Sequence, residues 1–333
     1  MPTGWTSLSA TPPARSVPAV PPPSETPPPR RAEDSAREEQ RNGPTAQFSL
    51  EQPTRGLASL VVSAAVRSTL ATVLARVHHH ETLYREWGLA QIDPFGKRVV
   101  LNLHGPPGTG KSLCAEAMAH ELGRPLLRVD HAELESKYVG ETPKNIKAAF
   151  RSAEEAGAVL FFDEADAILG KRLTSVTQSA DQSVNSARST MLTQMDRHSG
   201  IVIFATNFFS SYDPAFLRRI FAHVELPLPD EACRVELWQR LLPATIPGAS
   251  SIDRQELAAR SGGLSGGDML EIIKRAASRA VQRTGPERRV TLADLLHEID
   301  SVSLVRAAHE GPRPGRPPAL ERLEEVPASS LPG

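Results

Sequence analysis

The chain has 333 residues, in which 38 lysines and arginines are balanced by 39 aspartates and glutamates for a formal net charge of −1. Such a balance gives no long-range attraction for a polyanion, so nucleic acid is not favoured as a partner. No apolar run approaches the ~20 residues that span a bilayer, and the polar N-terminus lacks the apolar core of a signal peptide, so we expect a soluble, cytoplasmic protein that has no membrane partner.

The two ends of the chain are predicted to be disordered. Ten prolines fall within the first thirty positions, among serine, threonine, alanine and arginine. Few large apolar residues are available there to offset the loss of chain entropy on folding. The C-terminal stretch repeats this chemistry on a smaller scale. We therefore expect residues 1–53 and 307–333 to be disordered and residues 54–306 to be folded.

The first predicted element is an amphipathic helix from Ser63 to about Tyr84. Its apolar residues recur three and four positions apart: Val66, Leu70, Val73, Leu74 and Val77. Ser63 is placed to cap the helix start, and three histidines at positions 78–80 end it. Neighbouring residues on a helix point in different directions, so we do not expect these histidines to share one metal ion.

Five short apolar runs follow, separated by helical segments. They are Val99–Leu103, Leu126–Val129, Val159–Phe162, Ile201–Ala205 and Val224–Leu226. Strands that alternate with helices form a parallel sheet, and strands that are apolar on both faces are covered by helices on each side. Residues 54–229 are therefore predicted to form an α/β domain with a parallel five-stranded sheet flanked by helices.

After Pro229 only helical patterns remain. They cover about residues 231–242, 254–260, 268–283 and 292–305. The sequence therefore predicts a small all-helical lid domain over residues 230–306.

A glycine-rich loop joins the first strand to a helix in the segment LNLHGPPGTGKSL, residues 101–113. Its glycines let backbone N–H groups converge on phosphate oxygens at the start of the helix. Lys111 is expected to reach the β and γ phosphates of a nucleotide, and the Ser112 hydroxyl to bind Mg²⁺. A turn that binds nothing is disfavoured because strand, loop, lysine and serine are all in register. The predicted cofactor-binding residues are Gly105, Pro106, Pro107, Gly108, Thr109, Gly110, Lys111, Ser112 and Leu113.

Two carboxylates end the strand VLFFDEAD, at the sheet edge where ligands of open parallel sheets bind. Asp163 is expected to face Mg²⁺ together with Ser112, and Glu164 to polarise the water that attacks the γ phosphate. An acidic pair after an apolar run is often only a solvated strand end, but the phosphate loop fifty residues earlier favours catalysis. Asn207, at the end of IVIFATN, is predicted to hold the attacking water or the γ phosphate.

GPPGTGKS, FFDEAD and ATN, in this order and spacing, resemble the AAA family within the AAA+ ATPases over about residues 55–305. The resemblance implies a P-loop NTPase fold that binds ATP and Mg²⁺. It also implies a homo-oligomeric ring, usually a hexamer, in which ATP lies between neighbouring subunits.

The segment DPAFLRRIFAHVELPLPD, residues 213–230, is similar to the corresponding segment of spastin and katanin relatives. Arg218 and Arg219 match the family's arginine fingers, which act on the nucleotide of the next subunit. An ordinary exposed basic pair is the alternative. An arginine acting in trans is worth orders of magnitude in rate, so a monomer is expected to be nearly inactive.

The motif GLSGGD, residues 263–268, resembles the GxSGAD signature that lies beside the adenine in this family. Gly266 and Gly267 are therefore predicted to contact the nucleotide, although Gly267 replaces the usual alanine. The residues that frame the adenine before the first strand are less similar to the family, and the region of Gly56 and Leu57 is one candidate.

Lys137, Tyr138, Val139 and Gly140, followed by Glu141, match the loop that lines the central pore of AAA rings. An exposed aromatic side chain on such a loop can grip an extended polypeptide of any sequence. Tyr138 could instead pack beneath the loop. The match implies translocation of a protein client.

Two functions fit these features. The first is an ATP-driven remodeller or unfoldase that pulls a protein client or adaptor-bound client into its pore. The second is a nucleotide-switched assembly or scaffold factor with little threading, in which the proline-rich N-terminus binds the partner. HHHETLYREWGL and FFDEADAILGKR resemble ATPases encoded with phage-tail-like contractile injection systems. A zinc protease is disfavoured because no HExxH motif occurs.

Overall fold

The computed structural model describes residues 48–93, 96, 98–134, 141–170, 179–207 and 212–310. These residues belong to one compact unit. None of the helices in this part of the chain combines the length and the apolar character that a membrane span needs.

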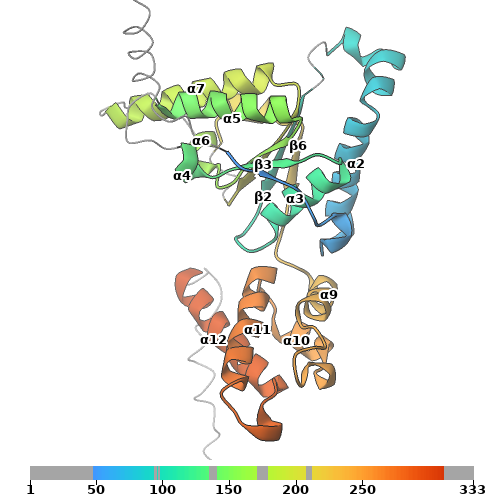
Figure 1. Cartoon of the computed structure of the whole chain (residues 1–333), viewed down its shortest axis with the longest axis vertical. Helices are drawn as coiled ribbons and strands as arrows, with labels where there is room; N and C mark the ends of the chain where they lie inside the picture. Colours follow the sequence, from blue (N-terminus) through green and yellow to red (C-terminus); the bar gives the residue numbers. More distant parts are fainter. Residues whose placement is uncertain are drawn as a thin grey trace, which may run out of the picture. The chain divides into compact units, whose positions relative to one another are not determined.

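The described strands form one six-stranded sheet, whose order is β1-β3-β4-β5-β2-β6 (Figure 1). Their bounds are Leu50–Glu51 (β1), Val99–His104 (β2), Leu126–Val129 (β3), Val159–Phe162 (β4), Ile201–Thr206 (β5) and Ala222–Glu225 (β6). Neighbours in the row β3-β4-β5-β2-β6 all run parallel. The five predicted strands and their parallel arrangement are confirmed.

The sheet has one more strand than the five predicted. Strand β1 pairs antiparallel with β3, with Leu50 opposite Leu127 and Glu51 opposite Leu126. It lies inside residues 1–53, which the composition predicted to be disordered, so that expectation is wrong for these two residues. A strand of two residues has no periodicity to detect, and it forms because β3 offers an open edge with unpaired backbone groups.

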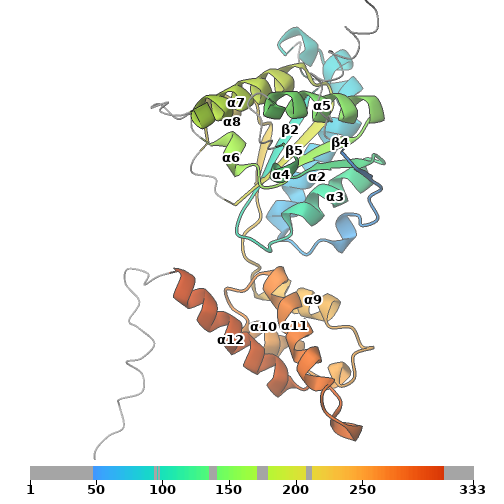
Figure 2. The ribbon, with the colours of Figure 1, turned by 60° about the vertical axis from the view of Figure 1, so that its left-hand side comes forward.

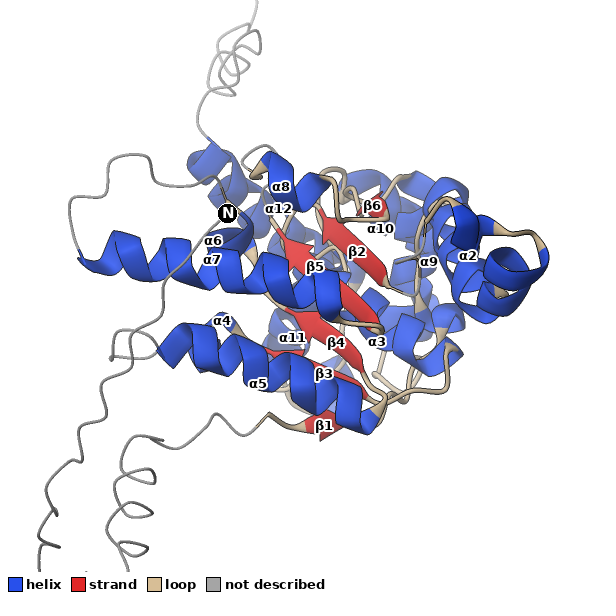
Figure 3. Ribbon diagram, turned by 90° about the horizontal axis from the view of Figure 1, so that it is seen from above, coloured by secondary structure: helices blue, strands red, loops and turns tan. Residues whose placement is uncertain are grey.

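Helices cover both faces of the sheet (Figure 3). Helices α5 (Glu141–Ala156) and α7 (Ser179–Arg197) lie on one face, and α2 (Ala64–His78) and α3 (Lys111–Glu121) on the other. Successive strand residues enter opposite cores: Leu160 joins the cluster under α5 and α7, whereas Phe161 joins the one under α2 and α3. This alternation explains why the central strands carry apolar residues on both faces.

Helix α2 begins as predicted but ends earlier. The Ser63 side chain accepts a hydrogen bond from the Val66 amide and caps the helix start. The α-helix stops at His78, and Thr82–Glu86 form a separate π-helical turn, so a continuous helix to Tyr84 was wrong. In that turn the Tyr84 hydroxyl accepts from Arg76 and donates to Asp93, which ties it to the segment before β2.

The described residues after Pro229 form only helices and connecting turns, as predicted, but the last helix continues to Glu310, so the expectation of disorder from residue 307 is wrong for residues 307–310. Figure 2 shows α9 (Glu231–Leu241), α10 (Arg254–Arg260), α11 (Gly266–Ala280) and α12 (Leu292–Glu310) packed against one another. They enclose their own hydrophobic core around Trp238, which is fully buried. The Trp238 indole donates to the buried Ser261 hydroxyl, so the core carries no unpaired polar group at that point.

The remaining helices are short connections. They are α4 (His131–Leu134), α6 (Asp166–Leu169), α8 (Pro214–Leu217) and the 3₁₀ turns Leu57–Ser59, Leu89–Gln91, Ala249–Ser251 and Gly285–Glu287. Helix α6 follows β4 and α8 follows β5, so both stand at the carboxyl edge of the sheet, where the predicted site residues also end.

Candidate functional site

The loop between β2 and α3 can be built only with glycine at two of its positions. Gly105 has φ of 144°, and a Cβ atom there would lie 2.1 Å from the carbonyl oxygen of Leu226. Gly108 has φ of 77°, and a Cβ atom there would lie 2.5 Å from the Ser265 hydroxyl oxygen. The loop therefore keeps a left-handed, tightly packed backbone that exposes its N–H groups before helix α3.

Lys111 opens helix α3 and turns back over the loop. Its ammonium group donates to the carbonyl oxygens of Gly105 and Pro106, at 2.8 and 2.9 Å. Burial lowers the pKa of Lys111, and the negative charges of Asp163 and Asp166 partly offset that effect. A charged amine held so close to the loop amides is placed to meet phosphate oxygens.

Ser112 and Asp163 converge from separate parts of the chain. The Ser112 hydroxyl donates to Asp163 Oδ2 at 2.8 Å, and Arg128 Nη1 lies 3.3 Å from the same oxygen. The Glu164 amide donates to Asp163 Oδ1 at 3.1 Å. Hydroxyl and carboxylate oxygens are the hard ligands that Mg²⁺ prefers, so this donor set fits the ion.

Glu164 is the only non-glycine residue in the described part of the chain with a positive φ, at 51°. A left-handed conformation costs an ordinary residue about 1–3 kcal/mol and persists where the surroundings impose it, often at functional sites. Here it stands two residues after the end of strand β4 and leaves the Glu164 side chain exposed. The backbone strain therefore presents this carboxylate at the sheet edge.

A cavity of about 490 Å³ brings Glu164 and Asn207 together with the predicted metal-binding residues Ser112 and Asp163. Its described lining residues are Pro107, Gly108, Lys111, Ser112, Asp130, Ala132, Asp163, Glu164, Ala205 and Asn207. The backbone N–H of Asn207 donates to Asp166 Oδ2 at 3.1 Å, and this bond fixes the end of β5 against the turn after β4. Lys111 is the only cationic side chain among these lining residues.

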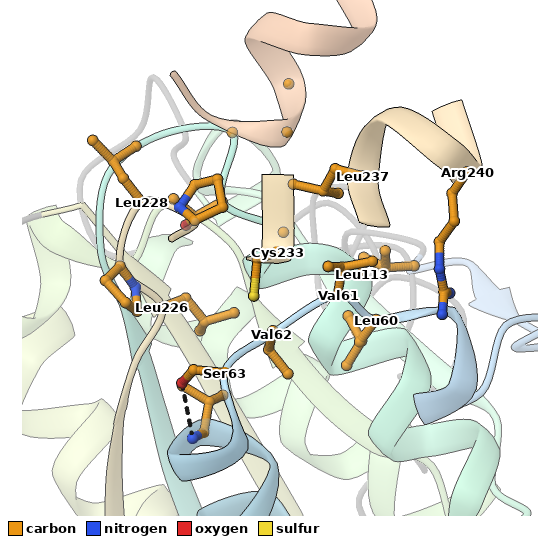
Figure 4. A pocket seen from close by; sticks show the side chains of 18 of the residues that line it. Leu60, Val61, Val62, Ser63, Leu113, Leu226, Leu228, Cys233, Leu237 and Arg240 are labelled. Carbon is orange, nitrogen blue, oxygen red and sulfur yellow. Dashed lines mark hydrogen bonds between the residues drawn. The ribbon is translucent and has the colours of Figure 1, made fainter. Parts of the chain in front are cut away.

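A second cavity, of about 370 Å³, shares Gly108 with the first and is mostly apolar (Figure 4). In the figure, Cys233 and Leu237 from α9 face Leu60 and Val62 from the segment before α2. Gly266 and Gly267 line it, as do the loop residues Thr109, Gly110 and Leu113. Gly56 and Leu57 are not among its described lining residues, but Arg55 and Ser59 on either side of them are, so the cavity borders the region considered in the sequence. The apolar run Leu60–Val62 before the Ser63 cap was the available signal.

Gly267 brings the helical part close to the phosphate loop. Its amide donates to the Gly108 carbonyl at 3.0 Å. A Cβ atom on Gly267 would lie 3.1 Å from Gly108 Cα, so the alanine usual in the family would require a small shift here. Glycine at this position allows the close approach of the two backbones.

Both cysteines are free thiols and buried. Burial raises the pKa of Cys114 to about 12, and burial raises that of Cys233 to about 11. Both side chains are therefore neutral at physiological pH, and Cys233 contributes an uncharged surface to the apolar cavity.

Arg218 and Arg219 follow α8 but differ in their surroundings. Arg219 forms a two-pronged ion pair with Asp196, at 2.9 and 2.7 Å, and also donates to the Ala215 carbonyl. The hydrogen bond to Asp196 raises the pKa of Arg219. Arg218 is exposed, and its side chain makes no hydrogen bond or ion pair within the described residues. Neither arginine lines either cavity of its own chain.

A buried polar network that the sequence did not reveal links two strands with the segment before α8. Asn102 Oδ1 accepts from the Tyr212 hydroxyl at 3.1 Å and from Thr206 Oγ1 at 3.5 Å. Thr206 and Tyr212 also hydrogen-bond to each other. Burial raises the pKa of Tyr212 to about 12, so its hydroxyl remains a donor. The network connects β2 and the end of β5 with Tyr212, two residues before α8.

The described residues do not include the predicted pore-loop residues Lys137, Tyr138, Val139 and Gly140. Their predicted roles therefore stay predictions. Glu141, the next residue, is the first of helix α5.

Residues 101–228 match the family model described as "ATPase family associated with various cellular activities (AAA)". The matched range begins within β2 and ends after β6. It includes the glycine loop, Asp163, Glu164, Asn207 and both arginines.

Curated relatives are similar over a longer range. The chain is 34% identical over 238 residues to "26S proteasome regulatory subunit 6B homolog" of Dictyostelium discoideum, covering 69% of this chain and 56% of that protein. It is 34% identical over 215 residues to "Proteasome-activating nucleotidase" of Methanothermobacter thermautotrophicus, covering 62% and 52%. It is 39% identical over 208 residues to "ATP-dependent zinc metalloprotease FtsH 3" of Sphaerobacter thermophilus, covering 60% and 41%. The chain thus spans about half the length of the curated relatives it matches.

Proposed function

Because this chain carries an ATPase domain of the AAA family, we propose that it binds ATP with Mg²⁺ and hydrolyses the nucleotide to ADP and phosphate. The observation that carries the proposal is the convergence of Ser112, Asp163 and Glu164 at one edge of the sheet.

The polar groups of this cavity divide into those that would hold phosphate, those that would hold Mg²⁺ and those that would activate water. Loop amides and the Lys111 ammonium group hold the β and γ phosphates, and Ser112 with Asp163 would hold Mg²⁺. The ion would neutralise phosphate charge. Glu164 then accepts a proton from the attacking water, and Asn207 holds that water or the γ phosphate.

The apolar cavity suits the adenine and ribose. It adjoins the phosphate cavity at Gly108, and its lining from Leu60 to Val62 and from Leu237 offers apolar surface for a planar base. Gly266 and Gly267 bring the helical part to this nucleotide. We place the boundary between the large domain, residues 54–229, and the lid, residues 230–306, at the chain segment beside this cavity.

The charges that line the phosphate cavity support a site that is completed by an arginine of a neighbouring subunit. Among its described lining residues, Lys111 is the only cation, whereas Asp130, Asp163 and Glu164 are acidic. Phosphoryl transfer builds negative charge on the γ phosphate, so a further cation is needed. Exposed Arg218 is available for the cavity of a neighbouring copy. The protein is accordingly a homo-oligomeric ring, with a hexamer as the expected form.

The work of the ring is remodelling of a protein client. The relatives named proteasome-activating nucleotidase and proteasome regulatory subunit support a protein rather than a small-molecule target. The proposed contact is the pore loop Lys137–Gly140, in which Tyr138 grips the client, delivered directly or by an adaptor.

The test combines ATP binding, ATP hydrolysis and particle size for wild type, Lys111→Ala and Glu164→Gln. Lys111→Ala should lose ATP binding, whereas Glu164→Gln should keep it and lose turnover. Glu155→Gln, an exposed glutamate on α5 whose side chain is 70% exposed, is the control and should behave as wild type. Wild type that fails to bind ATP with Mg²⁺, or Glu164→Gln with normal turnover, would overturn the proposal.

Tyr138→Ala separates remodelling from hydrolysis. It should leave basal hydrolysis intact and abolish client processing. Unchanged client processing by this variant would contradict the threading role and leave the ATPase assignment standing.

A further inference from the structure

Arg128 on strand β3 lies between strand β1 and the carboxylate of Asp163. Its Nε atom is 3.2 Å from Glu51 Oε1, and its Nη1 atom is 3.3 Å from Asp163 Oδ2. Its Cζ atom also lies 5.2 Å from the centre of the Phe161 ring. One planar guanidinium group therefore contacts an acid on each of two sides and an aromatic face on a third.

These contacts restrict where the guanidinium can point. Phe161 is fully buried in strand β4, so its ring gives the Arg128 guanidinium a packed surface to lie against. The Arg128 and Asp163 side chains are only 26% and 24% exposed, so water screens their interaction less than that of a free surface pair. Nε and Nη1 belong to one rigid, planar guanidinium group. If the contact between Nε and Glu51 changes, the group turns and the contact between Nη1 and Asp163 changes with it.

Strand β1 is a small element at the edge of the sheet. It contributes two residues, and a short edge strand adds little stability by itself. After it, the Thr54 backbone amide and the Arg55 side chain bind Glu116 on α3, the helix that begins with Lys111. The segment thus contacts both β3, which carries Arg128, and α3, which carries Lys111 and Ser112.

We infer that Arg128 is a positioning residue for Asp163, and that docking of strand β1 through Glu51 sets the orientation of Arg128. The inference rests on the proposed nucleotide site and adds a connection to it. Loss of the Glu51 contact would change how readily Asp163 serves Mg²⁺.

The direction of the effect follows from the contacts. Asp163 Oδ2 accepts from both Ser112 and Arg128, so the Arg128 guanidinium helps to hold this oxygen in place. Glu51 in turn holds the guanidinium through its Nε atom. Without Glu51, the guanidinium loses that anchor and orients Asp163 less well, so a higher Mg²⁺ concentration is needed.

The experiment measures binding of a fluorescent ATP analogue to the full chain while Mg²⁺ is titrated. Glu51→Gln should raise the Mg²⁺ concentration for half-maximal binding about two- to fivefold, the range of a partly exposed ion pair. Glu271→Gln is the matched control, because its side chain is 48% exposed and paired with Arg275, against 44% for Glu51. An unchanged Mg²⁺ dependence in Glu51→Gln would overturn the inference.

Variants of Arg128 separate positioning from simple charge. If Arg128 acted only as a nearby positive charge, Arg128→Met would tighten Mg²⁺ dependence. A positioning residue predicts the opposite, because Asp163 loses a donor that orients it, and Arg128→Lys should recover part of the loss. Tighter Mg²⁺ dependence in Arg128→Met would refute the positioning role.

A double substitution tests the path from β1. If Glu51 acts through Arg128, then Glu51→Gln should have no further effect in an Arg128→Met background. Additive effects of the two substitutions would refute the path. Wild type that binds no ATP analogue at saturating Mg²⁺ would instead refute the proposed nucleotide site, so the two failures are distinguishable.

Discussion

The hydroxyl of Ser112 donates a 2.8 Å hydrogen bond to the carboxylate of Asp163, although the two residues are 51 positions apart. Ser112 lies in the first turn of the helix after the glycine loop, and Asp163 directly follows strand β4. Their contact joins the phosphate-binding half of the proposed site to its metal-organising half.

Ser112→Ala should therefore weaken the response to Mg²⁺ more than ATP binding itself. A hydrogen bond to a charged group contributes about 1.5–3 kcal/mol, which corresponds to roughly ten- to a hundredfold in a binding constant. Titration of Mg²⁺ at a fixed concentration of ATP analogue measures the shift. Ser278→Ala, which removes a hydroxyl bonded within α11, is the control. A wild-type Mg²⁺ dependence in Ser112→Ala would contradict the assignment.

Gly108→Ala should abolish nucleotide binding through close contact. The added Cβ atom would lie 2.5 Å from Ser265 Oγ and 3.4 Å from Gly267 Cα, which separates the loop from the helical part. Gly123→Ala is a matched control, since Gly123 also has a positive φ but no atom within 4 Å of a Cβ. Gly123→Ala should introduce backbone strain of about 1 kcal/mol, which lowers the melting temperature, and it should leave the affinity for nucleotide intact. Equal affinities for the two variants would show that contact with Ser265 is unimportant.

Tyr212→Phe should destabilise the sheet near α8. It removes the hydroxyl that serves Asn102 and Thr206, both fully buried, and leaves polar atoms without that partner. A buried group left unsatisfied costs about 1–3 kcal/mol. Urea unfolding measures the change in the free energy of unfolding. An unchanged value would mean that the network adds nothing to stability.

The Arg219–Asp196 pair should give a characteristic pH dependence. The hydrogen bond from Arg219 lowers the pKa of Asp196 below its ordinary value of 3.8. A carboxyl with a lowered folded-state pKa stabilises the fold above its unfolded pKa, and this contribution is lost as pH falls through the folded-state pKa. Asp196→Asn should thus lower the melting temperature at neutral pH, and the difference from wild type should shrink below pH 3.8. A difference that is constant with pH would contradict this role.

The sequence predicted best the features whose residues lie close together along the chain. The five parallel strands were predicted because their runs are mostly apolar, as a sheet covered on both faces requires. The cavity around Lys111 was predicted because the glycines, Lys111 and Ser112 are contiguous and the acids follow a strand. The left-handed geometry of Glu164, with its φ of 51°, was not predicted, because no local pattern marks it.

Features that depend on distant partners were missed. Strand β1 exists because β3 has an open edge, and its two residues carry no pattern of their own. The apolar cavity combines Leu60 with Cys233 and Leu237, which only the folded chain brings together. Likewise, the two arginines are neighbours in sequence, and only Asp196, 23 residues before Arg219, distinguishes them.

That distinction between Arg218 and Arg219 leads to the most direct test of a site shared between subunits. Arg218→Ala should lower turnover by about 10³–10⁵-fold, the usual contribution of an arginine finger, with little change in melting temperature. Glu164→Gln should also be inactive by itself. In a mixed oligomer, however, an Arg218→Ala subunit with intact Glu164 can receive Arg218 from a Glu164→Gln neighbour. We predict that mixing the two inactive variants restores ATP hydrolysis; a mixture that stays inactive although the subunits assemble together, or full activity of Arg218→Ala alone, would contradict the shared site.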